Sequence, residues 1–227
     1  SGSLLMRNLA ERAIWCAQEA IKIDPDVPGG RLRLAGGLVA TGQSQRASQI
    51  LLQELREDPG NVQALLLHAD VLADTGRANE ALIKLHRVLE LEPANIDAHI
   101  RSGKYAMNEQ RWEEAFIAWG LVRRLQPNHR TACLHLAQTL LAMQRPAGAR
   151  PLLQEYLDRI DDSTSNEEKL HVAELLLGVG EPSLAITLLE KLRVSYEDND
   201  PMKLNCLHVL AVGIVASDKI DAGAEVS

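Results

Sequence analysis

The sequence predicts an all-α fold of stacked antiparallel helix pairs, because three sets of residues share one period of 34 residues. The first set consists of helix-ending prolines, at Pro25, Pro59, Pro93 and Pro127. The second consists of small residues at Ala13, Ala47, Ala81, Ala115 and Ala149. The third, also of small residues, is Ala35, Ala69, Gly103 and Ala137. Independent positions with a common period predict an array of structural repeats.

Each repeat contains two helical patterns joined by a short turn. In the unit 28–61 the apolar residues follow spacings of three and four, which indicate helices, at Leu34, Ala35 and Leu38, and then at Leu51 and Leu55. Gly42 and Gly76 lie where a first helix must stop, because glycine readily adopts the left-handed conformation of a helix C-terminus. The proline ends each second helix, since it lacks an N–H group and disfavours helix in the preceding residue.

The period divides the whole chain, residues 1–227, into one array, which we expect to be a fragment of a longer protein. Its expected parts are a partial unit with a second helix only at 1–27, full units at 28–61, 62–95, 96–129, 130–163 and 166–199, and a partial unit at 200–227. The fifth unit is displaced by two residues, because Ala185 follows Ala149 by 36. Pro151 predicts a late start or a kink in the fourth unit's second helix. The last unit is expected to hold a helix over 201–216 and the beginning of a partner helix.

These residues resemble the tetratricopeptide repeat (TPR) family, whose 34-residue unit has small residues at positions 8 and 20 and proline near position 32. The large residue that the family has at position 4 is weakly kept, with Arg31, Leu65, His99, Cys133 and Lys169 there. The resemblance implies a right-handed superhelical α-solenoid with a concave face that binds other proteins.

Composition excludes several classes of function. The net charge of −7 disfavours binding to nucleic-acid phosphates. Cys16, Cys133 and Cys206 are too scattered for a disulfide framework or a zinc site, so we expect buried free thiols. No run reaches the roughly 18 apolar residues of a membrane span. A cytoplasmic location is expected, or a periplasmic one if a signal sequence was removed, because the start Ser-Gly-Ser resembles a cloning remnant.

Motifs for catalysis are weak, so we expect no enzyme, no cofactor and no bound metal. "GLVATGQS", residues 37–44, imitates a phosphate-binding loop, but Gln43 replaces the essential lysine and a helix precedes it. His135 and His171 occupy equivalent places, with Glu174 as the one nearby further ligand, and groove lining is the favoured interpretation. His68 is expected to be a hydrogen-bonded core residue. The aromatic cluster around Trp119 is interpreted as core packing, with an aromatic pocket as the alternative.

The resemblance to the TPR family also implies which residues face the concave groove, because the first helix of each pair lines it. Transferred position by position, the partner-binding residues are Arg33, Leu66, Asp70, Ile100, Arg101, Lys104, Asn108, Leu134, His135, Gln138, Leu170, His171 and Glu174. Leu32, Leu66, Ile100, Leu134 and Leu170 form an apolar strip within this surface. Arg101 and Lys104 add a basic spot, which suits an acidic group on a partner.

The leading hypothesis is therefore a non-catalytic scaffold that binds a peptide or helical segment with apolar and acidic side chains. A chaperone cofactor role is disfavoured, because no three units carry the Lys and Asn set that grips a C-terminal carboxylate, and Asp70 would oppose one. The alternative is a recognition region of a larger enzyme, such as a transferase. Exposed terminal helices also predict a homo-oligomer.

Overall fold

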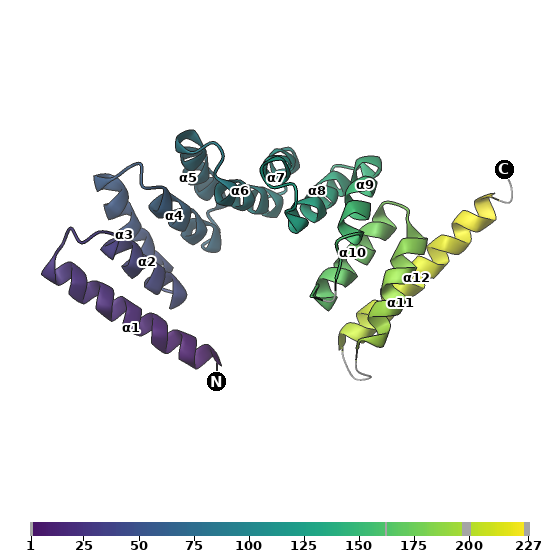
Figure 1. Ribbon diagram of the computed structural model, residues 1–227, viewed down its shortest axis with the longest axis horizontal. Coiled ribbons are helices and arrows are strands. Elements are labelled where there is room, and N and C mark those ends of the chain that lie inside the picture. Colours follow the sequence, from purple (N-terminus) through teal and green to yellow (C-terminus); the bar gives the residue numbers. More distant parts are fainter. Residues whose placement is uncertain (1, 162, 197–200, 225–227) are drawn as a thin grey trace. The chain divides into compact units, whose positions relative to one another are not determined.

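The computed structural model describes the backbone of residues 2–161, 163–196 and 201–224, and the side chains of 8–161, 163–196 and 201–217. All regular secondary structure in these residues is helical (Figure 1). The helices are α1 (Gly2–Ile23), α2 (Gly30–Ala40), α3 (Ser44–Glu57), α4 (Val62–Asp74), α5 (Ala78–Leu91), α6 (Ile96–Asn108), α7 (Trp112–Leu125), α8 (Arg130–Ala142), α9 (Pro146–Leu157), α10 (Asn166–Gly178), α11 (Pro182–Val194) and α12 (Pro201–Ala224). The predicted all-α fold is confirmed.

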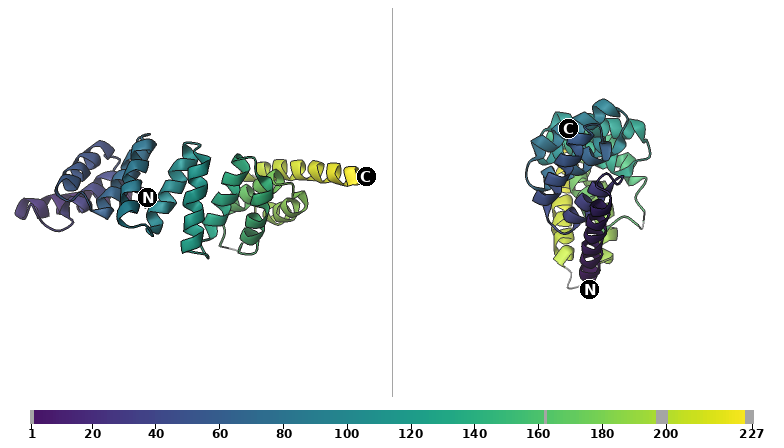
Figure 2. Two further views of the ribbon diagram at one scale, coloured as in Figure 1. Left: turned by 90° about the horizontal axis from the view of Figure 1, so that it is seen from above. Right: turned by 90° about the vertical axis from the view of Figure 1, so that its left-hand side faces the viewer.

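The chain forms two compact units, Ser1–Ala118 and Trp119–Ser227, and their boundary lies within α7. In the first unit each helix from α1 to α5 packs against the next one along the chain, and α4 also contacts α2 and α6 (Figure 2). In the second unit α8 packs on α9, α10 on α11 and α11 on α12, and α10 additionally contacts α8 and α12. The first helices of successive pairs therefore contact one another: α2, α4 and α6 in the first unit, and α8, α10 and α12 in the second.

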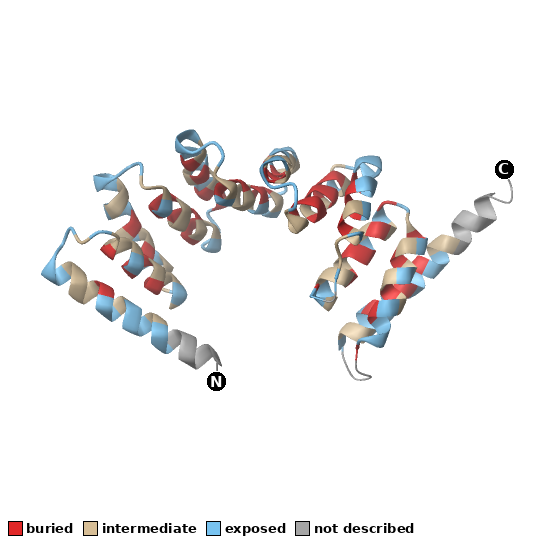
Figure 3. Cartoon of the chain, viewed as in Figure 1, coloured by how far each residue is buried: buried red, intermediate tan, exposed pale blue. Residues whose placement is uncertain are grey.

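Small residues allow this close packing. The alanines of the two small-residue series that are completely buried are Ala35, Ala47, Ala69, Ala81, Ala115, Ala137 and Ala149. Figure 3 shows the buried positions along the helix faces that neighbouring helices share. Ala13 is the exception in its series, because it lies on an exposed face of α1.

The turn within each pair has one geometry throughout. After α2, the Gly42 N–H donates to the Val39 carbonyl and the Gln43 N–H donates to the Leu38 carbonyl, at 2.9 and 2.8 Å. This is a Schellman motif, which requires positive φ at the first residue beyond the C-cap. Glycine has this positive φ after α2 and α4, with 74° at Gly42 and 76° at Gly76, as predicted. At the equivalent positions after α6 and α8 the residue is glutamine, and φ is 58° at Gln110 and 57° at Gln144. The phosphate-loop imitation is thus a helix C-terminus.

Asparagine starts the next pair. The Asn61 side chain accepts a hydrogen bond from the Ala64 N–H at 3.1 Å, and Asn95 accepts one from the Ala98 N–H at 2.9 Å. Such N-caps satisfy backbone donors that a helix leaves unpaired at its start. The stretch "DPGN" therefore ends one helix through its proline and begins another through its asparagine.

Three details differ from expectation. Helix α9 starts at Pro146, in register with the other second helices, so the late start is wrong and Pro151 lies inside the helix. Helix α12 continues to Ala224 without a break, because no glycine or proline follows Gly213 until Gly223, so the expected partner helix does not begin near residue 216. Cys133 and Cys206 are buried free thiols, but Cys16 is exposed.

Candidate functional site

The candidate site in the first unit is the surface shared by the neighbouring helices α2, α4 and α6. We call it the first-helix face and define it by Arg33, Leu66, Asp70, Ile100, Arg101, Lys104 and Asn108. Leu66 and Asp70 are one turn apart on α4, as Ile100 and Lys104 are on α6, so each pair shares a helix side. Leu66 and Ile100 are half-buried, whereas Lys104 and Asn108 are exposed.

Asp70 is the centre of a hydrogen-bonded cluster that joins α4 to α6. Its Oδ1 accepts a hydrogen bond from Arg101 Nε at 2.8 Å and another from the Tyr105 hydroxyl. Burial and the hydrogen bond to Asp70 raise the pKa of Tyr105 above its ordinary value of 10, so the hydroxyl remains a neutral donor near pH 7. Burial alone would lower the pKa of Arg101, but the hydrogen bond and charge of Asp70 outweigh it and raise this pKa.

The Asp70 cluster takes up one of the two cations, Arg101 and Lys104, of the predicted basic spot. Arg101 was expected to be available to a partner, but its charge is compensated by Asp70, and its Nη1 also donates to the Asp97 carbonyl at 3.3 Å. Arg33 is exposed and donates from Nη1 to the Pro28 carbonyl at 2.8 Å. Lys104 has no ion pair among the described residues. The available cation on the α6 part of the face is therefore Lys104.

The corresponding surface of the second unit exposes less of its apolar side chains. Leu134 and Leu170 are only 5% and 6% exposed. They were predicted to contact a partner, and in this structure both side chains have little exposed surface with which to do so. The apolar strip therefore does not continue at the surface of this unit.

The polar residues predicted for the surface of this unit are His135, Gln138, His171 and Glu174. His135 stacks on Trp119 with ring centroids 4.3 Å apart, and Trp119 is completely buried, so the core interpretation of Trp119 is confirmed. His171 Nδ1 lies 3.5 Å from Glu174 Oε2, and Gln138 is half-buried. Among the residues with described side chains, no three His, Cys, Asp or Glu residues are grouped to hold a metal ion.

Two buried histidines of the first unit are structural. His68 Nε2 and Ser48 Oγ are 2.9 Å apart, as expected for a hydrogen-bonded core residue. Burial, with smaller effects of Lys84 and Arg77, lowers the pKa of His68 to about 4. His99 Nε2 lies 2.9 Å from the Pro93 carbonyl and ties α6 to the turn before it.

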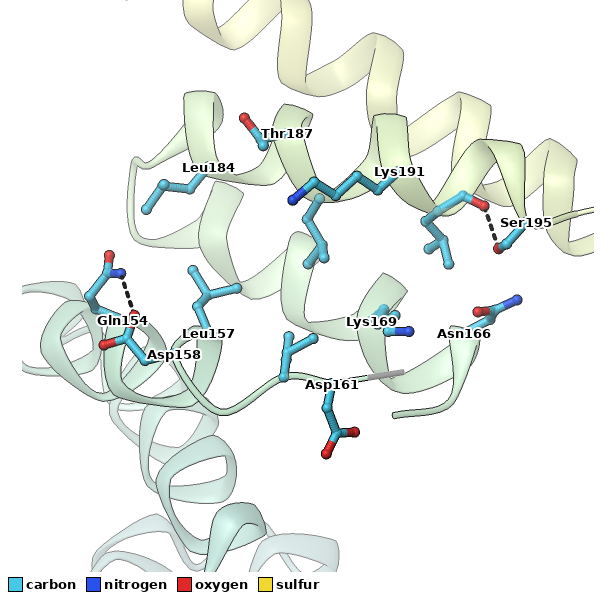
Figure 4. A pocket seen from close by; sticks show the side chains of 13 residues that line it. Gln154, Leu157, Asp158, Asp161, Asn166, Lys169, Leu184, Thr187, Lys191 and Ser195 are labelled. Carbon is cyan, nitrogen blue, oxygen red and sulfur yellow. Dashed lines mark hydrogen bonds between the residues drawn. The ribbon is translucent and has the colours of Figure 1, made fainter. Parts of the chain in front are cut away.

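Sequence reasoning missed a cavity of about 550 Å³ in the second unit (Figure 4). Helices α9, α10 and α11 and the connection after α9 line it, so it does not include the predicted groove residues. Its lining residues are Gln154, Leu157, Asp158, Ile160, Asp161, Asn166, Lys169, Leu184, Thr187, Leu188, Lys191, Leu192 and Ser195. The signal available in the sequence was the two-residue displacement of the fifth unit.

No helix in the described part of the chain has the length and apolarity needed to cross a membrane.

Comparison with known proteins supports the fold. The tetratricopeptide repeat family matches residues 32–96, and no curated protein matches the sequence. The structure is similar to that of pilF from Pseudomonas aeruginosa, with 19% identity and a TM-score of 0.73 over 91% of each chain. It is also similar to YrrB, titled "a TPR protein with an unusual peptide-binding site", with 16% identity and a TM-score of 0.61 over 75% of this chain and 85% of that one. MamA is similar at 17% identity, with a TM-score of 0.63 over 71% of this chain and 87% of that one. The resemblance is thereby confirmed: residues 32–96 carry tetratricopeptide repeats, and the chain has the fold of a tetratricopeptide-repeat protein.

Proposed function

We propose that this chain is a non-catalytic scaffold that binds a peptide or helical segment of another protein in the groove lined by its first helices. The observation that carries the proposal is the first-helix face, where Leu66 and Ile100 are half-buried and Lys104 is exposed without an ion pair. Partly exposed apolar side chains gain free energy when a partner covers them, and a cation beside them orients that partner.

The chemistry of the face specifies its ligand. The Asp70 carboxylate is already bound by Arg101 and Tyr105, so it does not repel an acidic group as strongly as an unpaired carboxylate would. Lys104 and the Asn108 amide both lie on the side of α6 that carries Ile100. An apolar segment with a carboxylate placed over Lys104 fits this arrangement. YrrB, which shares the fold, has a peptide-binding site by its title, in agreement with the proposal.

Affinity capture from the native lysate with a charge-reversed variant tests the proposal. Lys104→Glu removes the available cation without disturbing the Asp70 cluster, whereas an Arg101→Glu change would also break that cluster. Lys84→Glu, on α5 and outside the first-helix face, is the matched control. We expect proteins retained by the wild type and by Lys84→Glu to be lost with Lys104→Glu. Equal capture by all three proteins at low salt would refute the role of the face.

We also propose that a second copy of the chain covers exposed apolar residues of its terminal helices. Trp15 on α1 is 63% exposed, and Leu204 and Val215 on α12 are 71% and 55% exposed. Exposed apolar side chains of this kind gain free energy when a second copy removes them from water. Sedimentation velocity should show a concentration-dependent oligomer that the Leu204→Gln/Val215→Gln variant weakens. A strict monomer at high concentration contradicts this part of the proposal.

A further inference from the structure

Helix α1 has the repeat register of a second helix. Ala13 precedes Ala47 and Ala81 in the small-residue series, and those two alanines are completely buried, whereas Ala13 is exposed. The first helix of its own pair covers Ala81, because α4 packs against α5 and Ala69 of α4 belongs to the same core cluster. Helix α1 therefore presents the face on which a first helix packs in the complete pairs.

A cavity of about 550 Å³ lies on this face, between α1 and the start of α2. Its lining residues are Ala13, Cys16, Ala17, Ala20, Val27, Gly30 and Arg33. Two repeat periods later, the residues that match Ala13, Ala17, Ala20 and Gly30 are Ala81, Leu85, Val88 and Ala98. All four of these later residues are completely buried, in one cluster with Leu65, Ala69 and Leu72 of α4. The cavity beside α1 therefore corresponds to the space that α4 fills in its own pair.

Helix α12 has the register of a first helix. It packs against α11 and α10, as α4 packs against α3 and α2. The buried residues among its described side chains are Cys206, Leu210 and Gly213, with the same spacings of four and three as the buried Ala64, His68 and Val71 of α4. The Cys206 thiol donates to the Leu189 carbonyl of α11 at 3.6 Å, so this side of α12 faces the preceding pair.

Another side of α12 is uncovered. On α4 the residues that directly follow the three buried ones are Leu65, Ala69 and Leu72, which lie in the core cluster shared with α5. The matching residues of α12 are Leu207, Ala211 and Ile214, and all three are exposed. Leu207 is 39% and Ile214 45% exposed, whereas Leu65 and Leu72 are 3% and 2% exposed. Residues 204–217 include no Asp, Glu, Lys or Arg, so α12 presents an apolar face of the kind on which a second helix packs. Figure 3 shows exposed positions along both α1 and α12.

We propose that α12 of one copy docks on α1 of another copy, so that Leu207, Ala211 and Ile214 fill the cavity beside α1 and the two helices form a new pair. This inference rests on the proposed association of terminal helices and specifies that the two different ends meet. The contact continues between copies the interface that first and second helices form within the chain, as in α4 with α5. A contact between two different surfaces leaves one of each free, so copies join head to tail into chains or rings.

Sedimentation velocity of two variants, each with one face removed, tests the proposal. Ala13→Glu/Cys16→Glu places carboxylates on the α1 face, and Leu207→Glu/Ile214→Glu places them on the α12 face. All four residues are exposed, so circular dichroism should show an unchanged helix content. We expect each variant alone to be a monomer and their equimolar mixture to form a 1:1 dimer, because each retains the face that the other lacks. Ile83→Glu, at a 66% exposed position of α5, is the matched control and should assemble as the wild type does.

The other outcomes separate this proposal from the association on which it rests. A dimer of Leu207→Glu/Ile214→Glu alone means that α1 pairs with α1, and a dimer of Ala13→Glu/Cys16→Glu alone means that α12 pairs with α12. Either result overturns head-to-tail docking while association of the terminal helices stands. A mixture that stays monomeric under conditions where the wild type assembles also overturns it, as does an Ile83→Glu control that no longer assembles. A wild type that is monomeric at high concentration refutes both the docking and the association.

Discussion

Arg101 Nε and Asp70 Oδ1 are 2.8 Å apart and join α6 to α4, the first helices of consecutive pairs. Both side chains are about 30% exposed, so the contact is partly screened by water. The Tyr105 hydroxyl donates to the same carboxylate oxygen. One aspartate thus fixes two side chains of the neighbouring helix and determines which cation of the first-helix face remains available.

Replacing Asp70 with alanine should lower the free energy of unfolding by about 1–2 kcal/mol, because Arg101 and Tyr105 both lose their acceptor. Urea denaturation followed by circular dichroism measures this loss. Asp74→Ala is the matched control, since Asp74 is an exposed carboxylate one turn further along α4, and it should change stability little. Equal effects of the two substitutions would show that the Asp70 cluster contributes nothing specific.

The small-residue series makes a prediction with an internal control. Ala81→Leu should lower stability by about 1–3 kcal/mol, because Ala81 is completely buried and a larger side chain forces neighbouring helices apart. Ala13→Leu places the same side chain at an equivalent but exposed position and should have an effect near zero. Thermal unfolding of both variants tests this difference. A tolerated Ala81→Leu change would refute the close-packing role of the series.

The positive φ of Gln144 predicts a stabilising substitution. Left-handed backbone is unfavourable for residues with a Cβ atom, so Gln144→Gly should stabilise the fold by up to about 1 kcal/mol. The converse change, Gly76→Ala, should destabilise it by a similar amount at the equivalent turn. Chemical denaturation of both variants measures the effect. A destabilising Gln144→Gly substitution would mean that the glutamine side chain makes a larger contribution than its backbone strain.

His68 predicts a pH dependence of stability. Burial lowers its pKa to about 4, against an ordinary value of 6.5, so between these values the unfolded chain binds a proton that the folded chain does not. Stability from this residue is complete above pH 6.5 and is lost as pH falls toward 4, with a slope of about 1.4 kcal/mol per pH unit. Comparison of urea unfolding for wild type and His68→Gln isolates this slope. Parallel stability curves across that range would exclude the shift.

Much of the fold was predictable because the 34-residue period indicates where helices begin and end. Helices α4, α6 and α8 begin at Val62, Ile96 and Arg130, each 34 residues after the last, where the sequence places the repeat starts. A proline follows the end of each preceding helix, and Asn61 and Asn95 cap α4 and α6, so local chemistry that a sequence reveals directly contributes to this spacing. The burial of the alanine series follows from the same register.

The site was less predictable because it depends on side-chain pairing between helices. Arg101 and Asp70 are 31 residues apart, a spacing that the repeat register brings together, so their contact could have been inferred from their positions in adjacent units. The burial of Leu134 and Leu170 depends on how closely α8 and α10 pack, which periodicity does not specify. The cavity beside α11 is lined in part by Ile160 and Asp161, which follow α9 where no repeat position applies.

Site-specific photo-crosslinking in the native lysate tests whether the first-helix face binds a protein partner. A photoreactive amino acid replaces Asn108, which is exposed on α6, and in a parallel protein it replaces Gln53, which is exposed on α3. We expect a discrete protein adduct from position 108 that position 53 does not form and that Lys104→Glu abolishes. An absence of adducts at 108, or the same adduct from both positions, would contradict it.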